Sequence, residues 1–374
     1  MSGEEQRDEA ASPATAAPAS VMEAEKEADA QATAPPAEDL EMTDNGPNSQ
    51  RQSPSPPQEG EAPGPSGAEE FTDSRMLRPQ PALARRGWRR WANLSTGGLI
   101  KLGRSAAEER EAQRMARATR PTAGSRRILV VSRKGGVGKT TVTLMLGHAF
   151  ATLRGDRVVA LDGDPDGGSL GYRVRRETSA SVKRLLDDHD SLESYTNIRG
   201  YTSQAPTRLE VVAAHDDPTL SQALGYDDYQ QAIRVLDKHY NLLLLDSGAL
   251  DGATQGMLEL ADQLIVVLAP SLDAARSASM TLDWLHEHGY GHLVAEAVAV
   301  INQVRDKVLL KHKVFEEHFQ RRCRSTVRIP WDPNLEVGGE TAFSDLLPAT
   351  RSAYLDLAAE VADGFPESAR NGTG

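Results

Sequence analysis

The chain has 374 residues and a formal net charge of −12, which is enough length for one large or two small domains. Its single cysteine, Cys323, excludes an internal disulfide, and no apolar run approaches the roughly 20 residues that span a bilayer. The first residues lack the basic and apolar regions of a secretory signal, so we expect a cytoplasmic protein.

The N-terminal part of the chain divides by charge into two segments. Residues 1–74 hold 10 of the 21 prolines, a net charge of −14 and one aromatic residue, Phe71. Such a segment cannot bury enough apolar surface to offset its conformational entropy, so it is predicted to be a disordered acidic tail rich in proline and alanine. Residues 75–127 reverse the sign with a net charge of +11, and residues 75–125 are taken as a basic arm.

Arginine and tryptophan are mixed in residues 85–104 of this arm. The mixture suits an anionic membrane surface, with tryptophan at the interface and arginine on phosphates. It also suits a nucleic-acid backbone, with tryptophan stacked on bases, or docking on the chain's own folded domain. These three alternatives stay open. Ser105 and Glu108 then form a capping box, which predicts a short exposed helix to about Ala118, serving as a spacer or partner helix.

Residues 126–365 alternate short apolar runs with longer amphipathic stretches. The predicted strands are 128–132, 157–161, 209–213, 242–245, 264–268, 298–301 and 326–329. The predicted helices are 140–154, 217–238, 252–262, 271–289, 307–322 and 348–363. Several apolar runs do not alternate, as in strands buried on both faces, so we predict a doubly wound, mostly parallel α/β sheet with ligands at the carboxyl ends of its strands. Residues 366–374 are predicted to be a disordered C-terminus.

A glycine-rich loop follows the first predicted strand and precedes a predicted helix. Its sequence is Lys134-Gly135-Gly136-Val137-Gly138-Lys139-Thr140-Thr141. Glycines let backbone N–H groups turn toward phosphate oxygens, and the helix start adds a partial positive charge. Lys139 is therefore predicted to reach the terminal phosphates of a nucleotide, and the Thr140 hydroxyl to complete a Mg²⁺ shell. The whole run from Gly135 to Thr141 is the candidate nucleotide-binding segment.

The loop also departs from the common phosphate-binding pattern. It has Arg133 where that pattern has glycine, and it has a second lysine, Lys134. The form K-G-G-x-G-K-T-T resembles the deviant Walker A loop of the MinD/ParA family of P-loop ATPases. The resemblance implies that Lys134 contacts the nucleotide of a partner subunit, so that ATP holds a homodimer together. Lys134 and Lys139 are accordingly the candidate catalytic lysines.

Two carboxylates mark the end of the second predicted strand, where Asp162 is followed by Asp164 and Pro165. Paired carboxylates beside a phosphate site can hold a metal through water and can orient or deprotonate an attacking water. An ordinary turn can have the same composition. The D-x-D-P pattern looks like the second ATPase motif of the MinD/ParA family. That match implies a Mg²⁺-shell role for Asp162 and a catalytic, water-positioning role for Asp164.

A third carboxylate, Asp246, ends the apolar run 242–245 in the manner of a Walker B element, which binds the metal through water. The MinD/ParA family usually has a proline two residues after this aspartate. This chain continues with Ser247 and Gly248 instead. The departure falls in the loop that is expected to sense the γ-phosphate, so it bears on switching more than on nucleotide binding.

Two further candidates come from later in the chain. Asn302 ends a predicted strand, and Asp332 lies in the segment Pro330–Leu335. In the MinD/ParA family an asparagine at this place and a P-x-D-x-x-L segment line the adenine pocket, which implies that role for both residues. A side-chain amide suits adenine because it can donate and accept at once. Strand ends and turns attract the same residue types without a ligand.

Together these motifs predict a Mg²⁺-dependent ATPase that dimerises on ATP, hydrolyses it slowly and regulates or positions a partner assembly. The acidic tail, the Gly-Trp-Arg-Arg arm and the segments 261–264 and 282–290 are similar to MinD-like ATPases associated with type VII (ESX) secretion in actinobacteria. This similarity implies a protein partner in a secretion or polar-positioning apparatus, with peripheral contact at the inner face of the cell membrane through residues 85–104.

Two alternatives from other functional classes remain. The first is a ParA-like partitioning ATPase that binds non-specific DNA, although Glu316 and Glu317 interrupt the basic residues between 307 and 324. The second is a nucleotide-dependent scaffold with little hydrolysis, which the altered loop after Asp246 suggests.

Overall fold

The computed structural model describes residues 106–165, 168–248, 252–306, 312–336 and 338–366. The predicted acidic tail, the basic arm up to residue 105 and the end of the chain from residue 367 lie outside these ranges. Within them, no helix is both long and apolar enough to cross a membrane.

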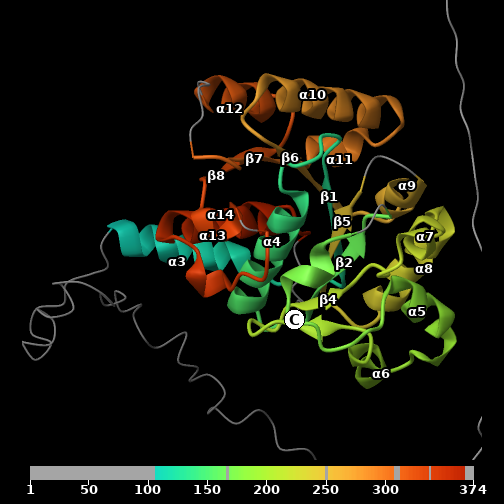
Figure 1. Ribbon diagram of the computed structural model, residues 1–374. Helices are drawn as coiled ribbons and strands as arrows, with labels where there is room; N and C mark the ends of the chain where they lie inside the picture. The colour runs from blue at the N-terminus through green and yellow to red at the C-terminus, as the bar shows by residue number, and fades with distance from the viewer. Residues whose placement is uncertain (1–105, 166–167, 249–251, 307–311, 337, 367–374) are drawn as a thin grey trace, which may run out of the picture. The chain divides into compact units, whose positions relative to one another are not determined.

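A single eight-stranded sheet organises the described residues, in the order β3-β4-β2-β5-β1-β6-β7-β8 (Figure 1). Every neighbouring pair is parallel except β3 with β4. The strands are β1 Arg126–Val131, β2 Val158–Gly163, β3 Ser203–Gln204, β4 Glu210–Val212, β5 Leu242–Ser247, β6 Gln263–Leu268, β7 Val298–Asn302 and β8 Ser325–Ile329. The predicted doubly wound, mostly parallel sheet is confirmed, and β3 is an antiparallel edge strand that was not predicted.

Helices cover both faces of this sheet (Figure 1). They are α3 Ala106–Ala118, α4 Lys139–Leu153, α5 Val182–Asp187, α6 Tyr195–Arg199, α7 Pro218–Gln222, α8 Tyr226–Asp237, α9 Gly252–Leu258, α10 Leu272–Glu287, α11 Gly291–Ala295, α12 His312–Gln320, α13 Pro333–Glu336 and α14 Pro348–Asp363. The described residues also form the short 3₁₀ turns η1 Leu170–Arg173, η2 His189–Ser191 and η3 Phe343–Asp345. α14 packs against α4, and α8 packs against α9.

The single helix predicted for residues 217–238 is wrong in one respect, because it is two helices. α7 ends at Gln222, and α8 begins after Gly225. The backbone N–H of Gly225 donates to the Asp228 carboxylate at 2.9 Å, so this point is a helix start rather than a helix interior. The strands, in contrast, follow the apolar runs closely, because β2, β5 and β6 are buried along their whole length.

The helix predicted to run to about Ala118 is present as α3, and many of its residues are exposed as expected, but it is not a free spacer. It packs along α14. Arg114 pairs with Asp356 at 2.6 Å, and Arg117 pairs with Glu360 at 2.6 Å and Asp363 at 2.5 Å. Residue numbers increase together along this contact, so the two helices run parallel. α3 is therefore an outer layer on the α4/α14 face.

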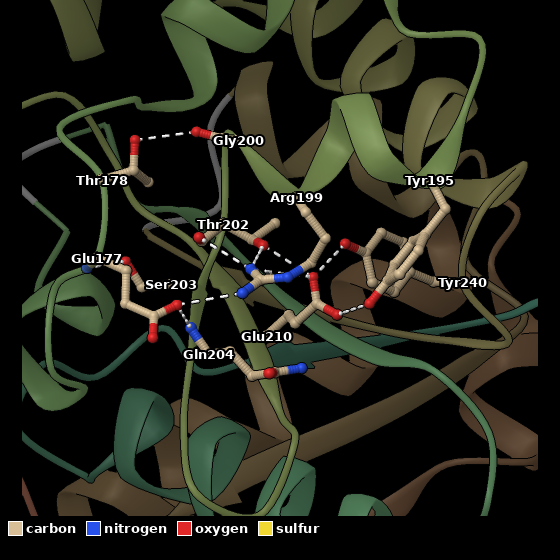
Figure 2. Close-up of polar contacts among 10 residues, drawn as sticks. All are labelled: Glu177, Thr178, Tyr195, Arg199, Gly200, Thr202, Ser203, Gln204, Glu210 and Tyr240. Atoms are coloured by element: carbon tan, nitrogen blue, oxygen red, sulfur yellow. Dashed lines mark hydrogen bonds and ion pairs between the residues drawn. The ribbon is translucent and has the colours of Figure 1, made fainter.

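A buried carboxylate, Glu210, holds together the segment between β2 and β5. Figure 2 shows the side chain of Glu210, on β4, enclosed by polar groups. Its oxygens accept hydrogen bonds from the hydroxyls of Tyr195 at 2.5 Å, Tyr240 at 2.6 Å and Thr202 at 2.8 Å. The Arg199 guanidinium lies 3.7 Å away. Glu210 is only 2 % exposed, so these donors replace the water that the carboxylate loses.

Replacing Glu210 with alanine is expected to lower the free energy of unfolding by about 3–5 kcal/mol, because the hydroxyls of Tyr195, Tyr240 and Thr202 lose their acceptor and the Arg199 charge loses a neighbouring carboxylate. Urea denaturation followed by circular dichroism measures the change. Glu177→Ala is the matched control, since Glu177 pairs with the same Arg199 but its side chain is 47 % exposed. That variant should lose less than about 1 kcal/mol. Equal small losses in both variants would contradict the structural role of the buried carboxylate.

Candidate functional site

The glycine loop lies where β1 ends and α4 begins. β1 is buried through Val131, and the first helical hydrogen bond of α4 runs from Val142 N–H to Gly138 O at 2.9 Å. Gly138 has φ +88°, a left-handed conformation that favours glycine. The loop therefore sits at the carboxyl edge of the sheet, at the N-terminus of a helix, as the sequence predicted. This arrangement directs backbone N–H groups toward an anion.

Asn302, at the end of β7, braces this loop. Its side-chain amide donates to Val137 O at 2.8 Å, and it is 6 % exposed. A Cβ on Gly138 would lie 2.4 Å from the Asn302 amide nitrogen, so glycine is also needed here for close approach. Asn302 was assigned to adenine from the sequence. The structure shows a bond to the loop, and contact with a base stays a prediction.

A cleft of about 340 Å³ opens beside the loop. It brings together four segments that are far apart in sequence, and its lining includes Gly136, Gly138, Thr141, Arg173, Asn302, Gln303, Val304, Pro330, Trp331, Asp332 and Leu335. The two residues assigned to adenine thus share one cleft with the glycine loop. The cleft is of the size that small-molecule ligands occupy.

Asp332 forms part of the wall of this cleft, and backbone N–H groups of other residues hold its side chain in place. Its carboxylate accepts from Asn334 N–H at 3.0 Å and from Leu347 N–H at 2.8 Å, and it is 2 % exposed. These bonds tie the turn after β8 to the start of α14. Any role of Asp332 at a base remains a prediction, and its visible function is to fix the wall.

Asp162 and Asp246 occupy paired positions on the adjacent strands β2 and β5. They are 0 % and 1 % exposed. Asp162 accepts from the backbone N–H groups of Asp164 at 3.3 Å and Leu170 at 3.0 Å. Asp246 accepts from the Thr143 hydroxyl at 3.0 Å. The structure therefore brings together the two carboxylates that the sequence assigned to a Mg²⁺ shell.

The electrostatics of this pair suit a cation. Burial, and next the neighbouring Asp246, raises the pKa of Asp162 to about 8. Burial raises the pKa of Asp246 to about 6, although hydroxyl hydrogen bonds from Thr140 and Thr143 and the charge of Lys139 oppose this shift. Two buried carboxylates that resist ionisation are stabilised when a positive ion is added nearby. The residues present thus fit a divalent cation with oxygen ligands.

Within the described ranges, no three His, Cys, Asp or Glu side chains are grouped to hold a metal ion unaided. Mg²⁺ commonly takes only one or two carboxylates and completes its shell with water and substrate phosphates. Thr140, Asp162 and Asp246 match that partial donor set. A metal at this place is therefore expected to depend on a bound nucleotide.

Asp164 lies against the loop that follows β5. A Cβ on Gly248 would be 2.8 Å from the Asp164 carboxylate, so a larger residue here would require that side chain to shift. This contact gives a physical reason for the departure noted in the sequence, because a proline at 248 would collide with Asp164. The backbone carbonyl of Asp164 accepts from Gly168 N–H at 3.2 Å. The loops after β2 and β5 are thus in direct contact.

Lys134 differs from Lys139 in its surroundings. Lys134 is exposed, and none of the described carboxylates forms an ion pair with it. Lys139 is half-buried at the first position of α4, where its charge acts on Asp246. The structure therefore places Lys139 inside the site and Lys134 on its outer surface.

Two residues of the site were not identified from the sequence. Thr143 joins α4 to Asp246, and a threonine one helical turn after Lys139 was the available signal. Arg173, in η1, donates to the Thr141 hydroxyl at 3.1 Å and lines the cleft. Burial lowers the pKa of Arg173. No motif marks Arg173, because its position depends on how η1 folds back over α4.

Comparison with known proteins identifies relatives of the nucleotide-binding domain. Residues 128–340 match the family model described as the CobQ/CobB/MinD/ParA nucleotide binding domain. The chain is 37 % identical over 295 residues to the ESX-1 secretion-associated protein EspI of Mycobacterium tuberculosis, an alignment that covers 77 % of this chain and 44 % of EspI. It is 27 % identical over 255 residues to the sporulation initiation inhibitor protein Soj of Bacillus subtilis, covering 63 % of this chain and 97 % of Soj.

Solved structures share the fold. A ParA family ATPase from Chlorobium tepidum superposes with a TM-score of 0.55 at 20 % identity, over 63 % of this chain and 98 % of that one. The septum site-determining protein MinD from Pyrococcus horikoshii, complexed with Mg-ADP, gives a TM-score of 0.51 at 20 % identity, over 63 % of this chain and 96 % of that one. At these identities the likeness concerns the fold alone.

Proposed function

We propose that this chain, which belongs to the CobQ/CobB/MinD/ParA nucleotide-binding family, is an ATP-controlled switch that dimerises on ATP and hydrolyses it slowly. One observation supports this most strongly. The glycine loop at the start of α4 and the buried pair Asp162 and Asp246 meet at the carboxyl edge of the sheet, beside a cleft of about 340 Å³. Phosphate donors, cation ligands and room for a nucleoside thus occur together.

Each part of the site has a role in this proposal. The loop N–H groups and Lys139 bind the phosphates, and Thr140, Asp162 and Asp246 hold Mg²⁺, which supplies positive charge to the phosphate oxygens when bound. Asp164 orients the attacking water, and its contact with Gly248 links that role to the loop after Asp246. Lys134, exposed and without a described ion-pair partner, reaches the nucleotide of a second copy. Positive charge from both lysines then stabilises the transition state.

The partner class follows from similarity rather than from geometry. EspI is named as an ESX-1 secretion-associated protein, and this chain spans about 44 % of its length. We infer that the switch acts on a protein of a type VII secretion apparatus, with the nucleotide-dependent dimer as the form that binds. The segment 85–104, which lies outside the described residues, is the candidate contact with that partner or with the membrane.

The dimer is tested by measuring molecular mass in solution with ATP, with ADP and without nucleotide, with nucleotide binding measured in parallel. Wild type should dimerise with ATP only. Lys134→Ala should still bind ATP but stay monomeric, because the cation that crosses the interface is gone. Arg133→Ala is the matched control, since Arg133 is also exposed in the same loop, and it should dimerise as wild type does. If the wild-type protein binds ATP and remains monomeric, the proposal of an ATP-controlled dimer is wrong.

A further inference from the structure

Arg173 is a cation of the cleft whose charge has no partner among the described residues. It ends η1 and lines the cleft together with Gly136 and Gly138. One guanidinium nitrogen donates to the Thr141 hydroxyl at 3.1 Å, and the buried Nε atom has no hydrogen-bond acceptor within the described part of the chain. No described carboxylate lies within ion-pair distance of it, and Asp246 acts on it only through space.

This arrangement is unfavourable for a guanidinium unless an anion is added. Burial removes water from the charge, and a neutral hydroxyl replaces only part of the loss. Arg176, three residues further on, differs in that its charge is paired, because it contacts Asp216 at 2.6 Å on the surface. A phosphate would satisfy Arg173, since its oxygens match the planar donor fork of a guanidinium.

We propose that Arg173 binds a phosphate group of the nucleotide held by its own protomer, as a second cation beside Lys139. The inference rests on the proposed nucleotide site and adds a ligand to it from a different element. Thr141, which Arg173 contacts, belongs to the first turn of α4, where the phosphate-binding N–H groups also lie. Arg173 thus approaches the phosphates from the β2 side of the cleft.

The same contact connects the nucleotide to the loop after β2, which carries Asp164. η1 begins at Leu170, whose N–H donates to the buried Asp162 at 3.0 Å. Asp162 in turn accepts from Asp164 N–H at 3.3 Å. When a phosphate binds Arg173, η1 is fixed at its first residue by Asp162 and at its last residue by the phosphate. Asp164 is held with it, because it is bonded to the same Asp162. Arg173 therefore binds the nucleotide directly and positions Asp164 indirectly.

The test is titration of wild type, Arg173→Gln, Arg173→Lys and Arg176→Gln with Mg-ATP, Mg-ADP and AMP. Arg173→Gln should weaken binding of the phosphates it contacts by about 10- to 100-fold, the range of one or two charge-assisted hydrogen bonds. Arg173→Lys should recover part of the loss, because charge returns without the planar fork. Arg176→Gln should bind as wild type does. The smallest of these nucleotides whose affinity falls in Arg173→Gln shows which phosphate Arg173 contacts.

A second measurement separates ligand binding from a structural role. Without nucleotide, Arg173→Gln should melt at or above the wild-type temperature, since it removes a buried, incompletely paired charge. A large fall in melting temperature would overturn the proposal. Wild-type affinity in Arg173→Gln, with binding lost in Lys139→Ala, would overturn this inference and leave the proposed function intact. Failure of wild type to bind any nucleotide would overturn both.

Discussion

Replacing Asp164 with asparagine is expected to lower ATP turnover by about 10²- to 10⁴-fold while ATP binding and ATP-dependent dimerisation persist. Asparagine keeps the shape of the side chain, and the backbone bonds of residue 164 to Asp162 and Gly168 do not involve the carboxylate. What is lost is the negative group that orients water and attracts its proton.

Phosphate release measures this effect, in steady state and in a single turnover. Asp187→Asn is the matched control, because Asp187 forms a surface pair with Lys183 on α5 and should leave turnover unchanged. Equal rates in wild type and Asp164→Asn would contradict the catalytic role. If both rates are also negligible while the dimer still forms with ATP, the chain acts as a nucleotide-dependent scaffold.

Replacing Lys139 with alanine is expected to weaken Mg-ATP binding by about 100-fold or more, equivalent to roughly 3 kcal/mol. Lys139 begins α4, and its charge lowers the pKa of Asp246 against the effect of burial. Its removal deletes a phosphate contact and also leaves the Asp162 and Asp246 carboxylates less compensated. Both effects disfavour binding of a polyphosphate, so the loss of Mg-ATP affinity should exceed the loss caused by removing an isolated surface charge.

Fluorescent nucleotide titration or calorimetry measures this loss. Lys183→Ala, which removes a lysine from the surface of α5, should bind Mg-ATP as wild type does. The apo forms of both variants should have similar melting temperatures, because Lys139 is only half-buried. Unchanged affinity in Lys139→Ala would show that the nucleotide binds elsewhere in the protein.

The sheet was predictable because its strands are continuous apolar runs that parallel pairing buries on both faces. Between β2 and β5, β4 was predicted, but three short elements were not. α5, α6 and β3 are six, five and two residues long, too short for a periodic pattern to distinguish them from loops. Their place is set by tertiary contacts, above all the hydroxyls and the guanidinium around Glu210, which a single sequence does not connect.

The site shows the same division between local and tertiary information. Lys139, Thr140, Asp162 and Asp246 could be located because the motif context fixes each one at a strand end or a helix start. Arg173 could not, since only the fold of η1 brings it to the cleft. The bond from Asn302 to the glycine loop was also hidden, because it joins residues 165 positions apart in sequence.

The pairing of α3 with α14 has a consequence for the order in which the protein is made. Arg114 and its partner Ser352 are 238 residues apart, so α3 leaves the ribosome roughly 10–50 s before its docking surface exists. A 13-residue helix is marginal alone in water, so α3 has little stability of its own during that interval. Its ion pairs with Asp356, Glu360 and Asp363 form only after α14 is synthesised. A nascent chain that stops before α14 therefore also lacks a folded α3.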